Sequence, residues 1–362
     1  MCTGVSQLAF VVSSLQKRAE TDHTEYGDLL VLYAINPDRQ RRELMWRLAE
    51  ACWEWVHIVF ISLDDTSSLH MVQNQLVHFV SSPETVKELW ICMPQGHIEQ
   101  TAMQVCQHAD IVLYEDGLYT YTELHDAKSL LLHPRRALIH VAVLLARSGS
   151  KLGVFPPFRT WPWRPISRSH LLLASTLRIA SRFREGDIHI TEPAYFHQFI
   201  DKCQGATDIN LKEHPISHPL ETILFLGEGF YIWGEMNWDE ELCIYQKIVQ
   251  SIVDRGYRVY WKEHPKSTRH FGEGLQDLFC ESKFIYRTSE SFCPIELFFK
   301  NSKPKYCVSV LSTALFTLSL LYDIKTFHAS KYFRTKLTHG HKLSLKLIEK
   351  HIPDIDRLQP LL

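Results

Sequence analysis

Short runs of apolar and β-branched residues alternate with longer amphipathic segments along the first third of the chain. The short runs predict β-strands over 8–12, 29–34, 56–61, 88–91 and 111–114. Helical periodicity fills the spaces between them, as in 39–55 and 96–108. Strands that alternate with helices form βαβ units, which build a parallel sheet covered by helices. The pattern therefore predicts an α/β protein.

A second series of the same kind begins near residue 221, with a predicted strand over 222–226. Asn237 can cap a helix, with Glu240 three residues later as in a capping box, and that helix ends before Gly256. Strands over 257–261 and 306–311 follow, and the latter leads into an apolar helical run over 314–321. We therefore expect two Rossmann-like halves with a boundary near 205–220. The predicted domains are 1–212, 213–335 and a helical segment, 336–362, that could pack back on the first domain.

Composition limits the possible partners and compartments. Apolar residues make up 45% and charged residues 22%, as in soluble globular proteins. A net charge of −2 provides no basic field for nucleic acid, so we expect no nucleic-acid partner. The nine cysteines form no CxxC and no signal peptide precedes them, which predicts reduced thiols in the cytoplasm. No apolar run is long enough to span a bilayer, so any membrane association would be peripheral.

The strand over 111–114 ends in Glu115-Asp116-Gly117. Ligands of open α/β sheets bind outside the carboxyl ends of the strands. Two adjacent carboxylates repel each other, which raises the pKa of one of them when the site is partly buried. Glycine after them permits a tight turn and a close ligand approach. The alternative is an ordinary exit from a strand, since Asp-Gly is a common turn dipeptide.

The strand over 257–261 leads into His264-Pro265, flanked by Lys262 and Lys266. The two lysines could hold a phosphate electrostatically, and the proline fixes the backbone next to the imidazole. The alternative is a surface histidine in a charged loop. The chain contains four His-Pro pairs, and only this one follows a clear strand. The others are His133-Pro134, His214-Pro215 and His218-Pro219.

Ser312-Thr313 lies at a predicted helix start, where hydroxyl and backbone N–H groups can bind an anion; an ordinary N-cap is the alternative. Glu296 could bind ribose hydroxyls or complement a helix dipole. Four prolines predict an extended loop over 155–168, whose Trp and Arg side chains could line an acceptor groove, touch a membrane or pack between domains. No histidine pair has metal-ligand spacing and Asp64-Asp65 is interpreted as a turn, so we expect no metal site.

Taken in order, these pieces resemble the bacterial α-2,8-polysialyltransferases, with the lipooligosaccharide sialyltransferases as near relatives. The family's D/E-D/E-G motif is matched by Glu115-Asp116-Gly117, its HP motif by His264-Pro265 and its S-S/T motif by Ser312-Thr313. Two weaker matches are Pro294-Ile295-Glu296 and Ser13-Ser14-Leu15-Gln16, which has Ser14 where proline is often found. The resemblance spans nearly the whole chain.

The resemblance implies a GT-B fold, in which two Rossmann-like domains face each other across a cleft. It implies transfer of sialic acid from CMP-sialic acid, with inversion and without a metal or cofactor, in capsule polysaccharide or lipooligosaccharide synthesis. Glu115 would be the general base, with Asp116 as the alternative, and His264 would act on the departing CMP phosphate. The residues that would bind the donor are Lys262, Pro265, Glu296, Ser312, Thr313 and Gly227.

The acceptor implied by the resemblance is a glycan, either lipid-linked or polymeric, and the enzyme would work in the cytoplasm or on the inner face of the inner membrane. Two other functions remain open. One is a CDP-glycerol-type polymer glycerophosphotransferase, for which His133-Pro134 would supply a second histidine motif. The other is a degenerate GT-B protein that binds without catalysis.

Overall fold

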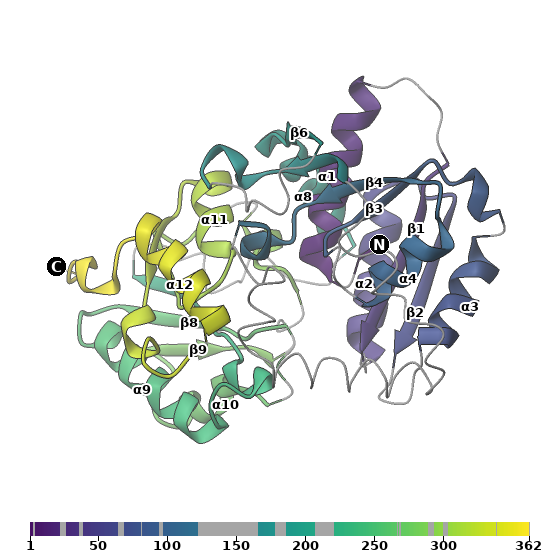
Figure 1. Cartoon of the computed structure of the whole chain (residues 1–362). Helices are drawn as coiled ribbons and strands as arrows, with labels where there is room; N and C mark the ends of the chain where they lie inside the picture. Colours follow the sequence, from purple (N-terminus) through teal and green to yellow (C-terminus); the bar gives the residue numbers. More distant parts are fainter. Residues whose placement is uncertain are drawn as a thin grey trace. The chain divides into compact units, whose positions relative to one another are not determined.

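The computed structural model describes residues 1–2, 4–21, 27–35, 39–63, 69–80, 82–93, 97–121, 166–177, 186–206, 221–265, 267, 269–288, 293–299, 303–337 and 339–361. The chain divides into two compact units, Met1–Ala206 and Thr207–Leu362 (Figure 1). Within these described segments, no helix is both long and apolar enough to cross a bilayer.

The first unit contains parallel strands flanked by helices. Its strands are β1 (Leu29–Ile35), β2 (His57–Leu63), β3 (Glu88–Ile91), β4 (Asp110–Tyr114), β5 (Ile166–Leu171) and β6 (Asp187–Ile190). Its α-helices are α1 (Val5–Thr21), α2 (Arg39–Cys52), α3 (Leu69–Phe79), α4 (His97–Val105) and α8 (Pro193–Gln204). Its 3-10 helices are η1 (Pro83–Thr85), η2 (Gly117–Tyr121) and η3 (Leu173–Ser175). Strand β1 pairs with β2, and the other four follow the order β3-β4-β5-β6.

The segment 8–12, predicted as a strand, is instead part of helix α1. This helix is buried along most of its length, so its apolar run shows little of the polar face that marks a surface helix. Its buried hydroxyls bond within the helix: Ser13 Oγ donates to the Ala9 carbonyl at 2.7 Å and Ser14 Oγ to the Phe10 carbonyl at 2.8 Å. The remaining strand and helix predictions for 29–114 are confirmed.

Residues before α1 connect β1 to β3. The N–H of Cys2 donates to the Val31 carbonyl at 2.9 Å, and the Cys2 carbonyl accepts from Tyr33 N–H at 2.9 Å. The amino group of Met1 donates to the Trp90 carbonyl at 2.8 Å. Cys2 thus forms an isolated parallel bridge with Leu32 of β1.

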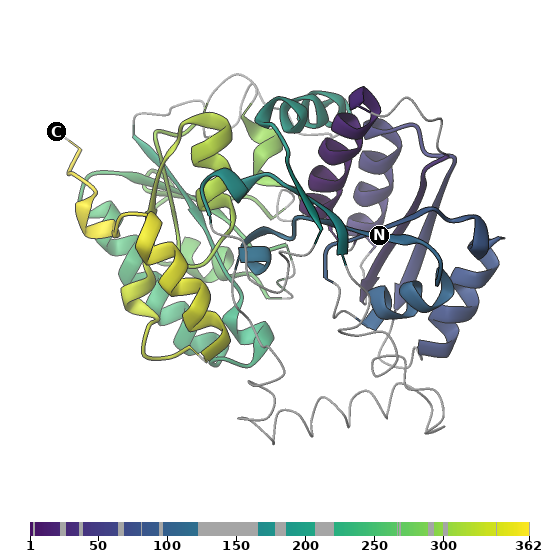
Figure 2. The same ribbon diagram turned by 45° about the horizontal axis from the view of Figure 1, so that its top comes forward.

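Helices cover both faces of the first unit's strands. Helices α3 and α4 share a hydrophobic core with β1, β2, β3 and β4. Helices α1, α2 and α8 pack against one another, and the rings of Phe10 and Phe196 meet at 5.5 Å. Figure 2 shows α1 (purple) beside α8 (teal). The predicted loop 155–168 is wrong at its end, because 166–168 begins β5; the rest of it lies outside the described residues.

The second unit holds a five-stranded parallel sheet of order β11-β10-β7-β8-β9. The strands are β7 (Thr222–Leu226), β8 (Arg258–Lys262), β9 (Phe284–Tyr286), β10 (Tyr306–Ser309) and β11 (Lys325–His328). The α-helices are α9 (Trp238–Val253), α10 (Phe271–Gln276), α11 (Ala314–Tyr322) and α12 (His339–His351). The 3-10 helices are η7 (Phe230–Trp233), η9 (Ile295–Phe298), η10 (Ser330–Tyr332) and η11 (Ile355–Arg357).

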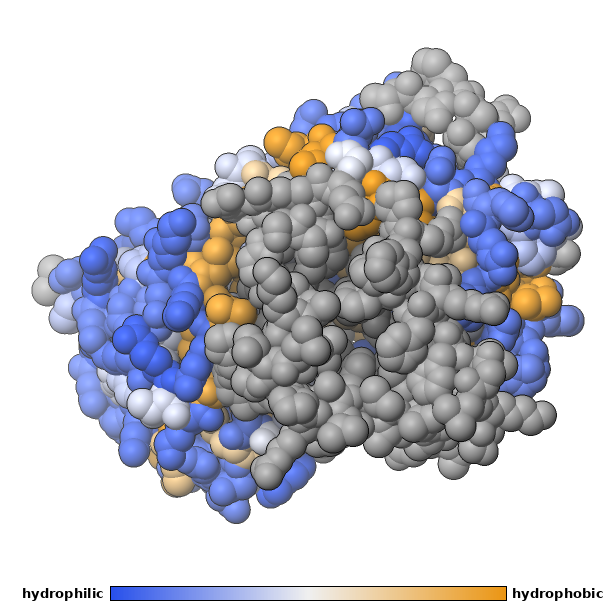
Figure 3. Space-filling model, in the orientation of Figure 1, coloured by the Kyte–Doolittle hydropathy of each residue, from blue (hydrophilic) through white to orange (hydrophobic). Residues whose placement is uncertain are grey.

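Helix α9 begins as predicted, since the Asn237 side chain accepts from the Glu240 N–H at 2.7 Å. Its apolar side packs with α10, α12 and alternate residues of β7 and β8 in one core, which includes Tyr245 and Trp261. Helix α11 contacts β10 and β11. In Figure 3 the outward surface over α9 and α12 is mainly hydrophilic, as expected of helices that bury one face.

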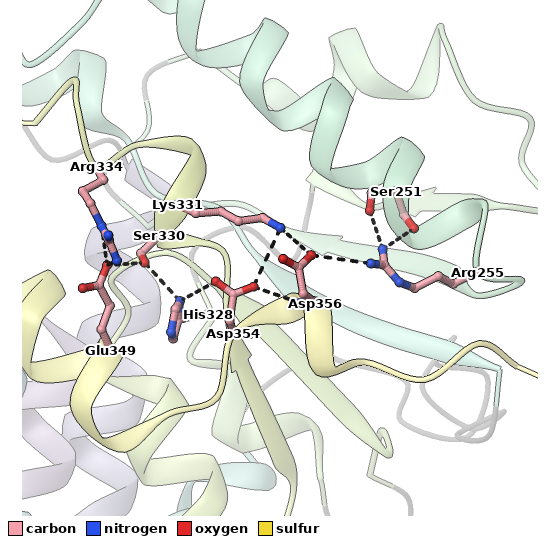
Figure 4. Close-up of polar contacts among 9 residues, drawn as sticks. All are labelled: Ser251, Arg255, His328, Ser330, Lys331, Arg334, Glu349, Asp354 and Asp356. Atoms are coloured by element: carbon pink, nitrogen blue, oxygen red, sulfur yellow. Dashed lines mark hydrogen bonds and ion pairs between the residues drawn. The ribbon is translucent and has the colours of Figure 1, made fainter.

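The segment after residue 335 belongs to the second unit, where polar contacts and apolar packing hold it. Glu349 of α12 accepts from Ser330 Oγ at 2.7 Å and from Arg334 at 2.8 Å. Figure 4 shows these contacts continuing to the residues near the C-terminus, where Asp356 pairs with Lys331 and lies 3.7 Å from Arg255. Leu345, Ile355 and Leu358 join the unit's hydrophobic core.

Candidate functional site

The acidic motif leaves the carboxyl end of β4, and Gly117 turns the chain into η2 with a left-handed φ of 57°. The Glu115 side chain is fully buried. Its Oε2 accepts hydrogen bonds from the N–H groups of Leu172 at 2.6 Å and Leu173 at 3.0 Å, and from the Tyr121 hydroxyl at 2.7 Å. Glu115 therefore ties the end of β4 to the turn that follows β5.

Burial raises the pKa of Glu115 to about 7, although the hydrogen bonds from Tyr121 and the two backbone N–H groups oppose the rise. Its other oxygen, Oε1, is buried without a hydrogen-bond partner. A carboxyl group in this state changes its charge near neutral pH, and its enclosed position suits it to hold the loop in place.

Asp116 is only partly buried. Its Oδ1 accepts from Gln7 Nε2 of α1 at 2.7 Å, and its backbone N–H donates to Thr120 Oγ1 at 3.0 Å. Its negative charge contributes to the raised pKa of Glu115 and of Glu99. Asp116 is thus the more accessible carboxylate of the motif, in a fixed position at the carboxyl edge of the first unit's strands.

Glu99 is a further buried carboxylate in the first unit that no sequence motif singles out. This residue of α4 is buried, and burial raises its pKa to about 7. The Tyr33 hydroxyl, at the end of β1, donates to its carboxylate. In the sequence Glu99 is a first-turn acidic residue like many others, and no local pattern distinguishes it.

In the second unit, three neighbouring strands bring the predicted donor residues to one edge of the sheet. Gly227 follows β7, Lys262 ends β8 and Ser312 follows β10, and the sheet order places β7 between the other two. The Gly227 N–H donates to the Lys262 carbonyl at 2.9 Å. An ideal Cβ on Gly227 would lie 2.5 Å from Cζ2 of Trp261, so the close approach requires glycine.

The Lys262 side chain is buried, and its Nζ donates to the Glu263 carbonyl at 3.2 Å. His264 is partly buried, with its ring 5.4 Å from the Trp233 ring and its carbonyl accepting from Ser267 N–H at 2.9 Å. Pro265 is exposed. Lys266 lies outside the described residues, as do Asp64-Asp65 and the His-Pro pairs beginning at residues 133, 214 and 218.

Glu263 anchors the histidine loop and was also missed. Its Oε2 accepts from Trp261 Nε1 at 2.9 Å and from the Gly272 N–H at 3.1 Å. Burial raises its pKa to about 7. The loop that presents His264 is therefore fixed at the residue before it.

Glu228 provides a second missed anchor, between β7 and β10. Its Oε1 accepts from Ser309 Oγ at 2.8 Å and from the Leu311 N–H at 3.0 Å, and its own N–H donates to the Tyr245 hydroxyl at 2.9 Å. Tyr245 in turn donates to Glu241, at 3.0 Å. Burial raises the pKa of Glu228 to about 7. This network holds the chain just before Ser312.

Ser312 and Thr313 precede α11 as predicted. Ser312 Oγ accepts from the Ala314 N–H at 3.2 Å, and the Thr313 carbonyl accepts from Phe316 and Thr317 N–H groups at 2.9 and 3.2 Å. Both side chains are partly exposed. The N-cap residue of α11 is Thr313, whose side chain makes no capping hydrogen bond, while the Ser312 hydroxyl accepts from the first N–H of the helix.

Glu296 lies in η9 and accepts from Thr317 Oγ1 at 3.2 Å. Burial raises its pKa, and the Lys262 charge partly opposes the rise. Glu296 and Lys262 are therefore electrostatic neighbours at the same edge. The structure groups Gly227, Lys262, His264, Glu296, Ser312 and Thr313 at the carboxyl edge of the second sheet, and Glu115 and Asp116 at the carboxyl end of β4 in the first unit.

The family model for alpha-2,8-polysialyltransferase (POLYST) matches residues 3–331. Among solved structures, an S. aureus MnaA–UDP co-structure is similar with a TM-score of 0.52 and 9% identity, over 96% of this chain and 86% of that one. UDP-N-acetylglucosamine 2-epimerase from Rickettsia bellii has a TM-score of 0.48 and 10% identity, over 98% and 88%. No curated protein sequence matches. The MnaA likeness concerns the fold alone and confirms the predicted GT-B fold.

Proposed function

Because the chain belongs to the alpha-2,8-polysialyltransferase family and is a glycosyltransferase, we propose that it transfers sialic acid from CMP-sialic acid to a hydroxyl group of a glycan acceptor. The observation that carries the proposal is the carboxyl edge of the second sheet. There a buried lysine and a histidine at the end of β8 lie on one side of β7, and the start of α11, which follows β10, lies on the other. These groups suit an anionic nucleotide donor.

On the donor side, the bond between the anomeric carbon and the phosphate oxygen breaks, and its electron pair stays on CMP. Negative charge grows on that phosphate, so positive and dipolar groups must face it. The side chains assigned to this task are Lys262, His264 as the acid or hydrogen-bond donor, and Ser312 with Thr313. Gly227 and Pro265 shape the loops, and Glu296 binds the ribose hydroxyls.

On the acceptor side, the hydroxyl oxygen attacks the anomeric carbon from the face opposite the phosphate, which inverts its configuration. The hydroxyl proton passes to a carboxylate. Asp116 is the better general base because it is partly exposed, whereas Glu115 is enclosed with three donors on one oxygen. Glu115 then acts as a positioning residue.

The donor carries one phosphate, whose charge Lys262, His264 and the start of α11 can balance, so the proposed reaction uses no metal. The acceptor would be a capsular or lipooligosaccharide glycan. The nine cysteines, none of them in a CxxC pair, favour a cytoplasmic enzyme or one attached peripherally to the inner face of the inner membrane. The glycerophosphotransferase alternative depended on His133-Pro134, which lies outside the described residues.

The test is an assay of CMP release from CMP-sialic acid with a panel of sialylated and galactosylated acceptors. We expect release that depends on one class of acceptor, together with a thermal shift on addition of CMP alone. If the protein shows no CMP release with any acceptor and also no thermal shift on addition of CMP, the proposed function is refuted. CMP binding without release would mean that the proposed acceptor class is wrong, because the donor-binding edge would then be intact.

A further inference from the structure

An exposed indole lies beside the histidine of the donor edge. Trp233, the last residue of η7, is 42% exposed although it is a large apolar side chain. Three rings surround the rest of it: Phe230 with centroids 6.2 Å apart, His264 at 5.4 Å and His341 of α12 at 5.3 Å. Exposed aromatic rings held next to a reactive group are typical of ligand contacts.

The surroundings of the indole are fixed without any ligand. Phe230 is buried, and its N–H donates to the Glu241 carboxylate at 3.0 Å. His341 Nδ1 lies 2.7 Å from Oε1 of Glu235, whose own N–H donates to the Phe230 carbonyl at 3.1 Å. Gly234 follows Trp233 in a left-handed conformation, with φ of 68°, and turns the chain toward α9. The exposed face of the indole is therefore preorganised, which lowers the entropic cost of binding a ligand.

The distance to His264 indicates which part of a donor this face would contact. In the proposed function, which this inference rests on, His264 acts at the phosphate oxygen that leaves the sugar. The transferred sugar is bonded to that oxygen, whereas the base is separated from the phosphate by the ribose. A ring 5.4 Å from the His264 ring is therefore close enough to contact the sugar bonded to that oxygen.

We propose that Trp233 forms a contact surface for the transferred sugar, against which the C–H face or the acyl methyl group of sialic acid packs. The indole would then help to select an acylated nine-carbon acid sugar over a smaller one. It would also exclude water from the face of the sugar next to His264, which favours transfer over hydrolysis.

The experiment compares two ligands with the full chain by isothermal titration calorimetry: CMP, which has no sugar, and a 3-fluoro CMP-sialic acid that resists transfer. Trp233→Leu removes the aromatic face and Trp233→Phe keeps one. Leu278→Ala is the matched control, since Leu278 is an exposed apolar residue of the same unit, 57% exposed. We expect Trp233→Leu to weaken the analogue about tenfold or more and to leave CMP within about twofold. Trp233→Phe should keep most of the affinity.

If Trp233→Leu weakens the binding of both ligands equally, the indole contacts the base and not the sugar. If the affinity for both ligands is unchanged, the indole contacts neither. Either result overturns the inference. A wild type that binds neither ligand refutes the proposed function and the inference with it. Should Trp233→Leu not fold, fluorescence of the wild type and Trp233→Phe decides. The analogue, and not CMP, should change a signal that Trp233→Phe lacks; the same change in both proteins overturns the inference.

Discussion

Glu115→Gln tests the separation of roles within the acidic motif. Glutamine keeps the shape of the side chain and a carbonyl oxygen that can accept from Leu172, Leu173 and Tyr121, as Glu115 Oε2 does. It removes the ionisable group. The NH2 group takes the place of Oε1, which has no hydrogen-bond partner.

The raised pKa sets the expected change in stability. A rise from 4.5 to about 7 in the folded state corresponds to about 3 kcal/mol at 1.36 kcal/mol per pH unit. Because the folded state holds this proton more tightly than the unfolded state, the stabilisation is complete below the unfolded pKa. It is lost as pH rises through about 7. Between about pH 5.5 and about pH 8, the wild type should lose about 2 kcal/mol through this residue alone.

The assay is thermal unfolding at both pH values for the wild type, Glu115→Gln and the exposed control Glu84→Gln. The other buried carboxyl groups titrate equally in all three proteins, so their effects cancel in the comparison. The difference in melting temperature of the first unit, Glu115→Gln minus wild type, should be about 4–8 °C larger at high pH than at low pH. The control should show no such gain.

Activity completes the test. Glu115→Gln should remain within about tenfold of the wild type, and Asp116→Asn should lose about 10²–10⁴-fold, the usual contribution of a general base. Two results would refute the reasoning. One is a pH-independent difference between Glu115→Gln and the wild type, which would mean that the carboxyl group is not buried with a raised pKa. The other is a loss of transfer in Glu115→Gln with Asp116→Asn active, which would make Glu115 the base.

Three further changes address the donor unit. His264→Ala should weaken CMP binding and reduce transfer about 10²-fold or more, measured by calorimetry and CMP release; full activity would remove His264 from the mechanism. Gly227→Ala places a methyl group against Trp261 and should lower CMP affinity, measured by titration, with normal affinity contradicting the close approach. Asn237→Ala removes the cap that accepts from Glu240 and should cost about 1 kcal/mol of stability in urea unfolding, without changing CMP affinity.

Most strands and helices could be predicted because their periodicity is local. One exception was 8–12, where a helix buried on several sides presents an apolar run that a strand would also show. Ser13 and Ser14 did not mark it as a helix, because their hydroxyl groups are satisfied by carbonyls of the same helix. Hydrogen bonding of that kind cannot be seen in the order of residues.

The motif residues could be selected from strand ends, but their supports could not. Glu228 is bound by Leu311, 83 residues away, and Glu263 by the Gly272 N–H. In the sequence, a loop glutamate that accepts such hydrogen bonds cannot be distinguished from a solvated glutamate, because its partners come from other strands and loops. The family resemblance favoured Glu115 over Asp116 as the base, and the difference in burial between the two, which depends on the turn after β5, cannot be seen in the sequence.

Proton NMR of the reaction mixture tests the central claim most directly. With CMP-sialic acid and an accepted glycan, the wild type should form a product with one added sialic acid in the inverted, α configuration, in step with CMP. The Asp116→Asn variant should form it far more slowly. A product with retained configuration, or CMP and free sialic acid without any glycan product, would contradict an inverting sialyl transfer.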